Sequence, residues 1–209
     1  MFNFAAQSTF KNMATNSHSD DLKTIRKIME ESSRFLSLNG LSGVFAGVFA
    51  LAGFTIAYIL IRNAELQKAY NLDLILFVDA LAVLALTLAS GVYLSYRKAI
   101  RTGAKIWTGT TRRMLLNLLI PLISGAVFIL FFYLNGDYYY IIPAMLIFYG
   151  LALVSAGKFT FGEIQYLGIF EVVTGFFAAL FPDYAMFAWA FGFGLLHILY
   201  GLIMHRKYR

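Results

Sequence analysis

The chain has 209 residues, of which 60% are hydrophobic and only 13% are charged, and its formal net charge is +6. Soluble domains carry about 25% charged residues, so this composition excludes an ordinary soluble domain and indicates an integral membrane protein. The chain contains no cysteine, which excludes disulfide bonds, thiolate metal ligands and a cysteine nucleophile.

The N-terminal part divides into two predicted segments. Residues 1–18 are polar and without periodicity, as in a mobile terminus. Residues 19–38 indicate an amphipathic helix that Ser19 or Asp20 can cap, with apolar residues at helical spacing. Such a basic helix suits the lipid headgroup layer, and packing on the protein's own cytoplasmic face is an equal alternative. No removable signal peptide is expected, because these residues lack an apolar core followed by a cleavage site.

Residues 39–209 form the predicted transmembrane domain. They contain six apolar segments of roughly 19 to 24 residues, and each is long enough to cross a hydrocarbon layer of about 30 Å as a helix. We therefore predict an all-α integral membrane bundle of six transmembrane helices, arranged as three hairpins. The expected spans are 41–61, 74–96, 114–134, 139–157, 161–181 and 184–204, and a tight turn at Phe181, Pro182 and Asp183 joins the last two.

The basic residues predict the orientation of the spans. If both termini are cytoplasmic, 15 of the 17 lysines and arginines lie on the cytoplasmic side, as the positive-inside rule requires. The second cytoplasmic loop is the most basic, and contact with anionic lipid headgroups is its predicted role. Because topology accounts for the positive charge, no nucleic-acid partner is expected. The residues concerned are Arg97, Lys98, Arg101, Lys105, Arg112 and Arg113.

The first span carries small residues at four-residue spacing, Gly43 with Gly47 and Ala46 with Ala50. Small residues on one face allow two helices to approach closely in lipid. Packing within the chain is the preferred interpretation. Contact with a second copy of the chain or with a partner membrane protein is the alternative.

Two ionisable residues, Glu171 and His197, fall inside the last two apolar segments. A charged group at the centre of a membrane helix costs on the order of 3 kcal/mol or more, and its presence suggests a function or a buried partner. Glu163 and His205 each lie eight residues, or about 12 Å, nearer the cytoplasmic end of the same helices. Glutamate and histidine are therefore expected to face each other at two depths.

Three interpretations of these residues follow. Glu171 and His197 form a structural pair that fixes helix register, or they belong to a proton or ion relay from the cytoplasmic surface, with Asp79 as an outer station. A metal or haem site is the least favoured, because the sequence contains no HExxH motif and no close cluster of ligands. Neither a metal nor a cofactor is therefore expected.

An enzymatic function is not expected. Ser90, Asp79 and His197 are the residue types of a hydrolytic triad, but no nucleophile elbow surrounds Ser90. Serine in membrane helices usually packs or bonds the backbone. An intramembrane hydrolase is kept as an alternative.

The last hairpin has a glycine-spaced helix, a proline turn and a second glycine-rich helix, with Gly168, Gly175, Pro182, Gly192, Gly194 and Gly201 at the positions concerned. In this it resembles the short repeat of the HdeD-like bacterial inner-membrane proteins. The resemblance implies six spans in three hairpins, a bacterial inner-membrane location and a link to acid stress, with no settled biochemical activity. The segment ESSRFLSLNGLSGVFAGVFALAG also resembles the start of an uncharacterised group of bacterial six-span membrane proteins.

The leading functional prediction is a non-enzymatic, multi-pass inner-membrane protein of a stress-associated or transport-like type, with Glu171 and His197 as its polar centre. The alternative class is a substrate-binding membrane subunit, similar to the vitamin-capturing components of energy-coupling transporters. Those subunits use an AxxxA patch on the first span to dock a partner helix, and residues Ala46 to Ala50 have that form.

Overall fold

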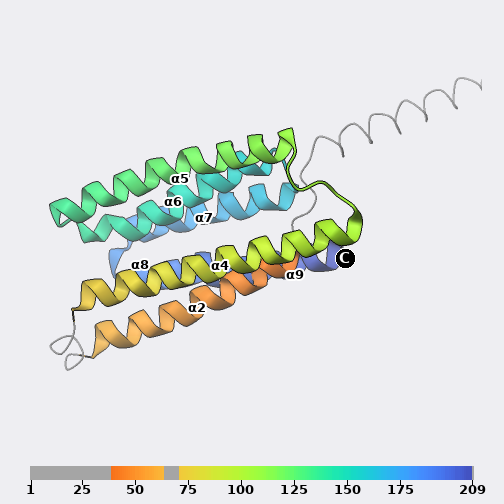
Figure 1. Ribbon diagram of the computed structural model, residues 1–209. Coiled ribbons are helices and arrows are strands. Elements are labelled where there is room, and N and C mark those ends of the chain that lie inside the picture. The colour runs from red at the N-terminus through yellow and green to blue at the C-terminus, as the bar shows by residue number, and fades with distance from the viewer. Residues whose placement is uncertain (1–38, 64–70, 209) are drawn as a thin grey trace, which may run out of the picture.

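The computed structural model describes residues 39–63 and 71–208, and every regular element within these ranges is helical. Six helical segments are long and apolar enough to cross a membrane, which confirms the predicted all-α six-helix fold (Figure 1). They are α2 (Gly40–Arg62), α4 (Leu72–Thr102), α5 (Gly109–Asn135), η1 with α6 (Tyr138–Tyr140 and Ile141–Gly157), α7 (Gly162–Leu180) and a composite sixth segment. The predictions for residues 1–18 and 19–38 lie outside the described residues.

The sixth segment, residues 182–207, is a composite of different helix types. It consists of the 3₁₀ turn η2 (Pro182–Tyr184), α8 (Ala185–Trp189), the π-helix η3 (Ala190–Leu196) and α9 (His197–Lys207). The predicted turn at residues 181–183 is present, since Phe181 follows α7 and Pro182 begins η2. The π-helix was not predicted, because hydropathy and helical spacing do not distinguish a π-helix from an α-helix. Such segments frequently occur at functional sites.

Capping residues, and not hydropathy, set several helix ends. The side chain of Asn39 accepts a hydrogen bond from the Leu41 N–H, 3.1 Å away, and begins α2 close to the predicted position. At the basic end of the bundle, α4 runs six residues beyond its predicted end at 96 and stops at Gly103, whose φ of +65° is the left-handed conformation favoured by glycine. Similarly, α5 begins at Gly109 after the Thr108 cap, five residues before the predicted start.

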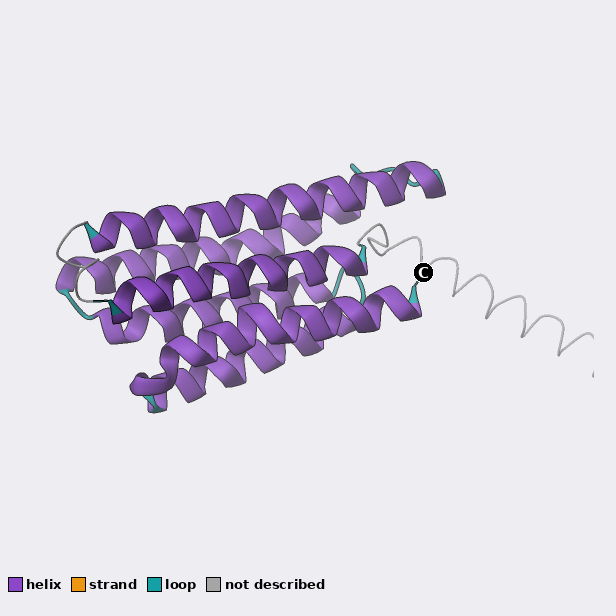
Figure 2. Cartoon of the chain, turned by 90° about the horizontal axis from the view of Figure 1, so that it is seen from below, coloured by secondary structure: helices purple, strands orange, loops and turns teal. Residues whose placement is uncertain are grey.

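The six segments pack in an open arc. The order of neighbours is α5, α6, α7, the composite sixth segment, α2 and α4. The axes of the long helices are roughly aligned with one another (Figure 2). Within the described residues, α4 packs along α2 and α5 packs along α6, while α4 and α5 share at most a marginal contact. The two ends of the arc are therefore unpaired with each other.

Glycine allows the closest helix pairs to approach. On α6 and α7, a Cβ built on either Gly150 or Gly168 would lie 2.6 Å from the other residue's carbonyl oxygen. On α2 and α9, a Cβ on Gly201 would lie 2.6 Å from the Gly40 carbonyl oxygen. These backbones are in contact, which is how small residues associate helices in lipid.

Two of the small residues singled out on the first span, Gly43 and Gly47, lie on the face of α2 that meets η3 and α9. A Cβ on Gly43 would lie 3.1 Å from the Gly201 Cα, and one on Gly47 would meet the Gly194 carbonyl. Ala46 and Ala50 are buried in the same region of the chain. This face is therefore covered by the protein itself, and Ala46 and Ala50 offer no open surface to a partner helix.

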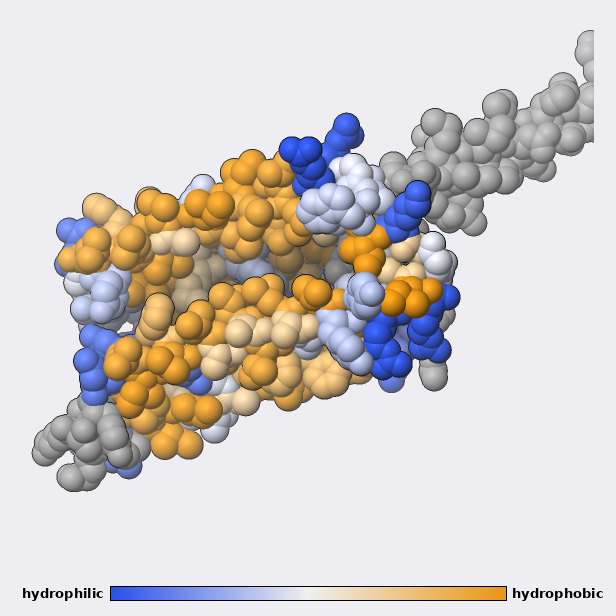
Figure 3. All heavy atoms as spheres, viewed as in Figure 1, coloured by the Kyte–Doolittle hydropathy of each residue, from blue (hydrophilic) through white to orange (hydrophobic). Residues whose placement is uncertain are grey.

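On the face of the bundle seen in Figure 3, apolar side chains cover the region between two hydrophilic ends. On α4, only Ala99 is buried, although the helix is rich in leucine. A surface this apolar is compatible with lipid and not with water, so the fold supports a multi-pass membrane protein.

Candidate functional site

Glu171 lies on the inward face of α7 and is completely buried, with 0% of its surface exposed. The carboxyl group fits because Gly192 of the π-helix has no side chain. A Cβ on Gly192 would lie 2.5 Å from Glu171 Oε2 and 2.6 Å from Leu146 Cδ2. The glycine therefore provides the space in which a polar group sits in the interior of the bundle.

His197 begins α9, directly after the π-helix, and is also buried. Its Nδ1 lies 3.0 Å from the Gly192 carbonyl oxygen, five residues earlier in the chain, and 3.3 Å from Glu171 Oε1. A carbonyl oxygen can only accept a hydrogen bond, so Nδ1 must carry a hydrogen and donate it. The close pairing of Glu171 and His197 that the sequence predicted is therefore present.

Tyr149 of α6 is the third member of this site and was missed by the sequence analysis. Its hydroxyl group lies 2.7 Å from His197 Nε2, and its ring packs against Phe193 with centroids 4.9 Å apart. With Nδ1 protonated, Nε2 of the neutral imidazole accepts the hydrogen bond, and the Tyr149 hydroxyl donates it. A depth comparison could have identified this residue, because Tyr149 lies eight residues before Gly157, where α6 ends at the basic side of the bundle.

Together these side chains form the Tyr149–His197–Glu171 chain, which joins α6, α9 and α7. Within the described residues neither carboxyl oxygen of Glu171 has a hydrogen-bond partner, although Oε1 is near the imidazole. An unpaired carboxylate would be costly in this interior. Two arrangements keep the pair neutral: a carboxylic acid beside an imidazole, or a carboxylate beside an imidazolium. The two arrangements interconvert when the Nδ1 hydrogen of the imidazolium passes to Oε1 of Glu171, which leaves a neutral imidazole with its hydrogen on Nε2 and no change in net charge.

The predicted second rung differs from the structure. Glu163, in the first turn of α7, forms an ion pair with Lys207 and accepts hydrogen bonds from the Tyr208 hydroxyl at 3.1 and 3.2 Å. His205 lies instead beside α2, where its backbone nitrogen would meet a Cβ on Gly40. The prediction that Glu163 and His205 face each other was wrong, because α9 turns Lys207 and Tyr208 toward α7 at this level.

Tyr200 of α9 lies between the two polar groups. Along the chain it follows His197, which contacts Tyr149, and precedes Tyr208, which contacts Glu163. Along α7 the corresponding buried positions are apolar, Ile164 and Leu167. The polar side chains therefore follow the tyrosines of α6 and α9 toward the basic end of the bundle.

Asp79 and Ser90 belong to a different part of the bundle. Both lie on α4, where an Asp79 carboxylate oxygen would be 3.2 Å from a Cβ on Gly53 of α2, and where the Ser90 hydroxyl donates to the Thr87 carbonyl oxygen at 2.9 Å. The ring nitrogens of His197 are directed at Tyr149 and Gly192 instead. Ser90, Asp79 and His197 are therefore not assembled as a triad.

In residues 39–63 and 71–208, no group of three or more histidine, aspartate or glutamate side chains is arranged to hold a metal ion. The predicted headgroup-binding residues lie at the end of α4, in the following loop and at the start of α5, and all are exposed except Lys98. Lys98 is partly buried, with its Nζ 5.5 Å from the centre of the Phe161 ring. Their contact with lipid phosphate stays a prediction.

The fold and the site define an all-helical, multi-pass membrane bundle with a buried Tyr149–His197–Glu171 chain next to a π-helix. Comparisons with protein-family models, with curated proteins and with solved structures find no match to the chain. The resemblance to the HdeD-like proteins therefore stays a prediction from the residues that suggest it.

Proposed function

We propose that this protein is a non-enzymatic, proton-responsive membrane protein of the transport-like or stress-associated type, and that the Tyr149–His197–Glu171 chain is its working centre. The observation that carries the proposal is a fully buried carboxyl group that has no hydrogen-bond partner among the described residues and lies 3.3 Å from a buried imidazole. A pair retained only to stabilise the fold would be expected to satisfy its polar atoms.

A proton can move within this centre in two linked steps. An incoming proton binds the Tyr149 oxygen while the Tyr149 hydroxyl hydrogen passes to Nε2, which converts His197 to an imidazolium with hydrogens on both nitrogens. The imidazolium then passes its Nδ1 hydrogen to Oε1 of the Glu171 carboxylate, which leaves a carboxylic acid beside a neutral imidazole with its hydrogen on Nε2. Histidine is suited to this role because it changes charge between pH 5 and pH 8.

Exchange with the aqueous phase is proposed to occur at the basic end of the bundle. The supporting observation is the order of His197, Tyr200 and Tyr208 along the chain, which leads from the contact with Tyr149 to the hydrogen bonds with Glu163. If this end faces the cytoplasm of a bacterium, as the positive charges favour, the centre would respond to cytoplasmic acidification. That response matches the acid-stress link implied by the HdeD-like resemblance. Asp79 has no described contact with the Tyr149–His197–Glu171 chain and is not included in the proposed proton path.

Infrared difference spectroscopy between pH 8 and pH 5 tests this proposal on the protein in lipid nanodiscs. We expect a pH-dependent carboxylic acid band that is absent in Glu171→Gln, because the amide cannot take up the proton. Glu163→Gln is the matched control, since it replaces the same residue type on the same helix outside the centre. It should keep the buried carboxyl band and alter only the rate at which the band develops.

Glu171→Gln should insert and purify like the parent protein, because glutamine has the same shape and carries no charge. A buried carboxyl band that persists unchanged in this variant would refute the proposed centre.

The substrate-binding subunit is less well supported as a second function. Its docking surface would require Ala46 and Ala50 to be accessible, whereas these residues are 9% and 3% exposed and therefore offer little surface to a partner helix.

A further inference from the structure

The open side of the helix arc forms a cleft between α4 and α5. The space-filling view shows a hollow between these helices (Figure 3), as expected from their marginal contact. The helices on both sides have many exposed apolar side chains, such as Leu84 and Leu88 on α4 and Ile123 and Val127 on α5. In a membrane such a cleft opens sideways to lipid, so the molecules that can enter it are lipid-soluble.

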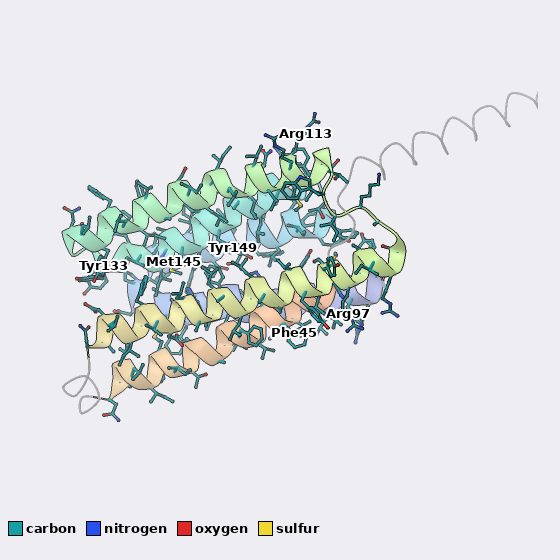
Figure 4. All side chains as sticks on the ribbon, in the orientation of Figure 1. Phe45, Arg97, Arg113, Tyr133, Met145 and Tyr149 are labelled. Carbon is teal, nitrogen blue, oxygen red and sulfur yellow. The ribbon has the colours of Figure 1, made fainter. Side chains whose placement is uncertain are left out.

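Tyr149 lies in this cleft. In the same orientation, Figure 4 places Tyr149 and Met145 of α6 in the space between the α5–α6 pair and α4. The Tyr149 ring and the neighbouring Phe193 ring are both partly exposed, and Phe193 also packs against Trp189 at 5.2 Å. The cleft therefore combines apolar walls with an aromatic surface, and the hydroxyl group of Tyr149 is held beside it by His197.

The hydrogen bonds of Tyr149 determine which polar group would complement the cleft. With His197 neutral, the phenolic hydrogen is donated to Nε2, and the lone pairs of the phenolic oxygen are left as acceptors. A hydroxyl group can donate to this oxygen, whereas an ether or a lipid acyl chain cannot. We propose that the cleft binds a lipid-soluble alcohol with a ring or polyene body, whose hydroxyl donates to Tyr149 and whose body packs on Phe193.

This inference rests on the proposed function for its coupling to protons. When an incoming proton converts His197 to an imidazolium by protonation at Nε2, Nε2 donates to the Tyr149 oxygen, and Tyr149 becomes a donor toward the cleft. The preferred ligand group then changes from a hydroxyl to a carbonyl. Proton position and ligand chemistry are therefore linked through one side chain, and each biases the other by the same factor.

Retinol and retinyl methyl ether are suitable probes, because they share a polyene body and differ at the hydroxyl. Binding is followed by energy transfer from Trp189 in a Trp107→Phe background, since the chain has only two tryptophans and Trp107 is exposed on the loop. At pH 8 we expect saturable binding of retinol. Its affinity should exceed that of the ether by about tenfold, which corresponds to one hydrogen bond in a site of low polarity.

Tyr149→Phe should bind both probes with equal affinity, because the rings remain and the acceptor is lost. Tyr166→Phe is the matched control: Tyr166 is 67% exposed on α7, and its variant should keep the tenfold preference. Equal binding of the two probes to the parent protein, which needs no variant, would overturn the inference. A preference that survives in Tyr149→Phe would do the same.

Glu171→Gln separates this inference from the proposed function. Glutamine leaves the Nδ1 hydrogen on the Gly192 carbonyl, so retinol should still be preferred at pH 8 while the carboxyl band disappears. A parent protein that shows the band but binds both probes equally would refute the cleft alone. A parent protein that prefers retinol but shows no buried carboxyl band would refute the proton centre alone.

Discussion

Replacing Glu171 by methionine is expected to raise the free energy of unfolding by about 1 to 3 kcal/mol while eliminating the pH-dependent carboxyl band. The carboxyl group is fully buried, and its oxygens have no hydrogen-bond partner within the described part of the chain. Its replacement therefore breaks no hydrogen bond and removes the free-energy cost of burying a polar group. Methionine fills a similar volume and adapts its shape to Gly192 and Leu146. Equilibrium unfolding in mixed micelles measures the change.

His197→Phe is the matched control, because it replaces the other residue of the Glu171–His197 pair. It removes the hydrogen bonds to the Gly192 carbonyl and to the Tyr149 hydroxyl, and it leaves both groups without that partner in a buried site. We expect a loss of about 1 to 3 kcal/mol. If Glu171→Met destabilised the protein as much as His197→Phe does, the structural interpretation, in which the pair fixes helix register, would replace the functional one.

Gly150→Ala and Gly168→Ala are each expected to lower the free energy of unfolding by about 1 to 3 kcal/mol. A methyl group at either position would lie 2.6 Å from a carbonyl oxygen of the facing helix, and backbone cannot rotate away as a side chain can. The α6–α7 pair would have to separate, and Tyr149 and Glu171, which lie on these helices, would move apart. The same unfolding measurement, together with infrared spectroscopy of the carboxyl band, tests both effects.

Gly91→Ala is the control for intrinsic helix propensity. Gly91 lies within α4, and a Cβ there would meet no atom of the described residues within 4 Å. Alanine should be neutral or stabilise the helix by about 1 kcal/mol at most. If Gly150→Ala and Gly168→Ala behaved like Gly91→Ala, the close approach of α6 and α7 would not be required for stability.

The sequence alone determined how many membrane-spanning helices the described residues form and at what depth the ionisable residues of the last two spans lie. Runs of apolar residues have a minimum length for crossing a membrane, so six segments could be counted directly. Because a helix rises 1.5 Å per residue, Glu171 and His197 could be placed at matching depths from the ends of their helices, and the structure brings them together. The same depth argument could have identified Tyr149. This residue was overlooked because its side chain is uncharged.

The rotation of each helix about its own axis was decided by the tertiary structure. In a soluble protein the polar face of a helix indicates its orientation, but a helix in lipid is apolar on both its inner and outer faces, so this signal is weak. For that reason Lys207 and Tyr208, and not His205, contact Glu163. The π-helix before His197 and the opening between α4 and α5 likewise depend on how helices from distant parts of the chain pack together, and no local sequence pattern specifies that packing.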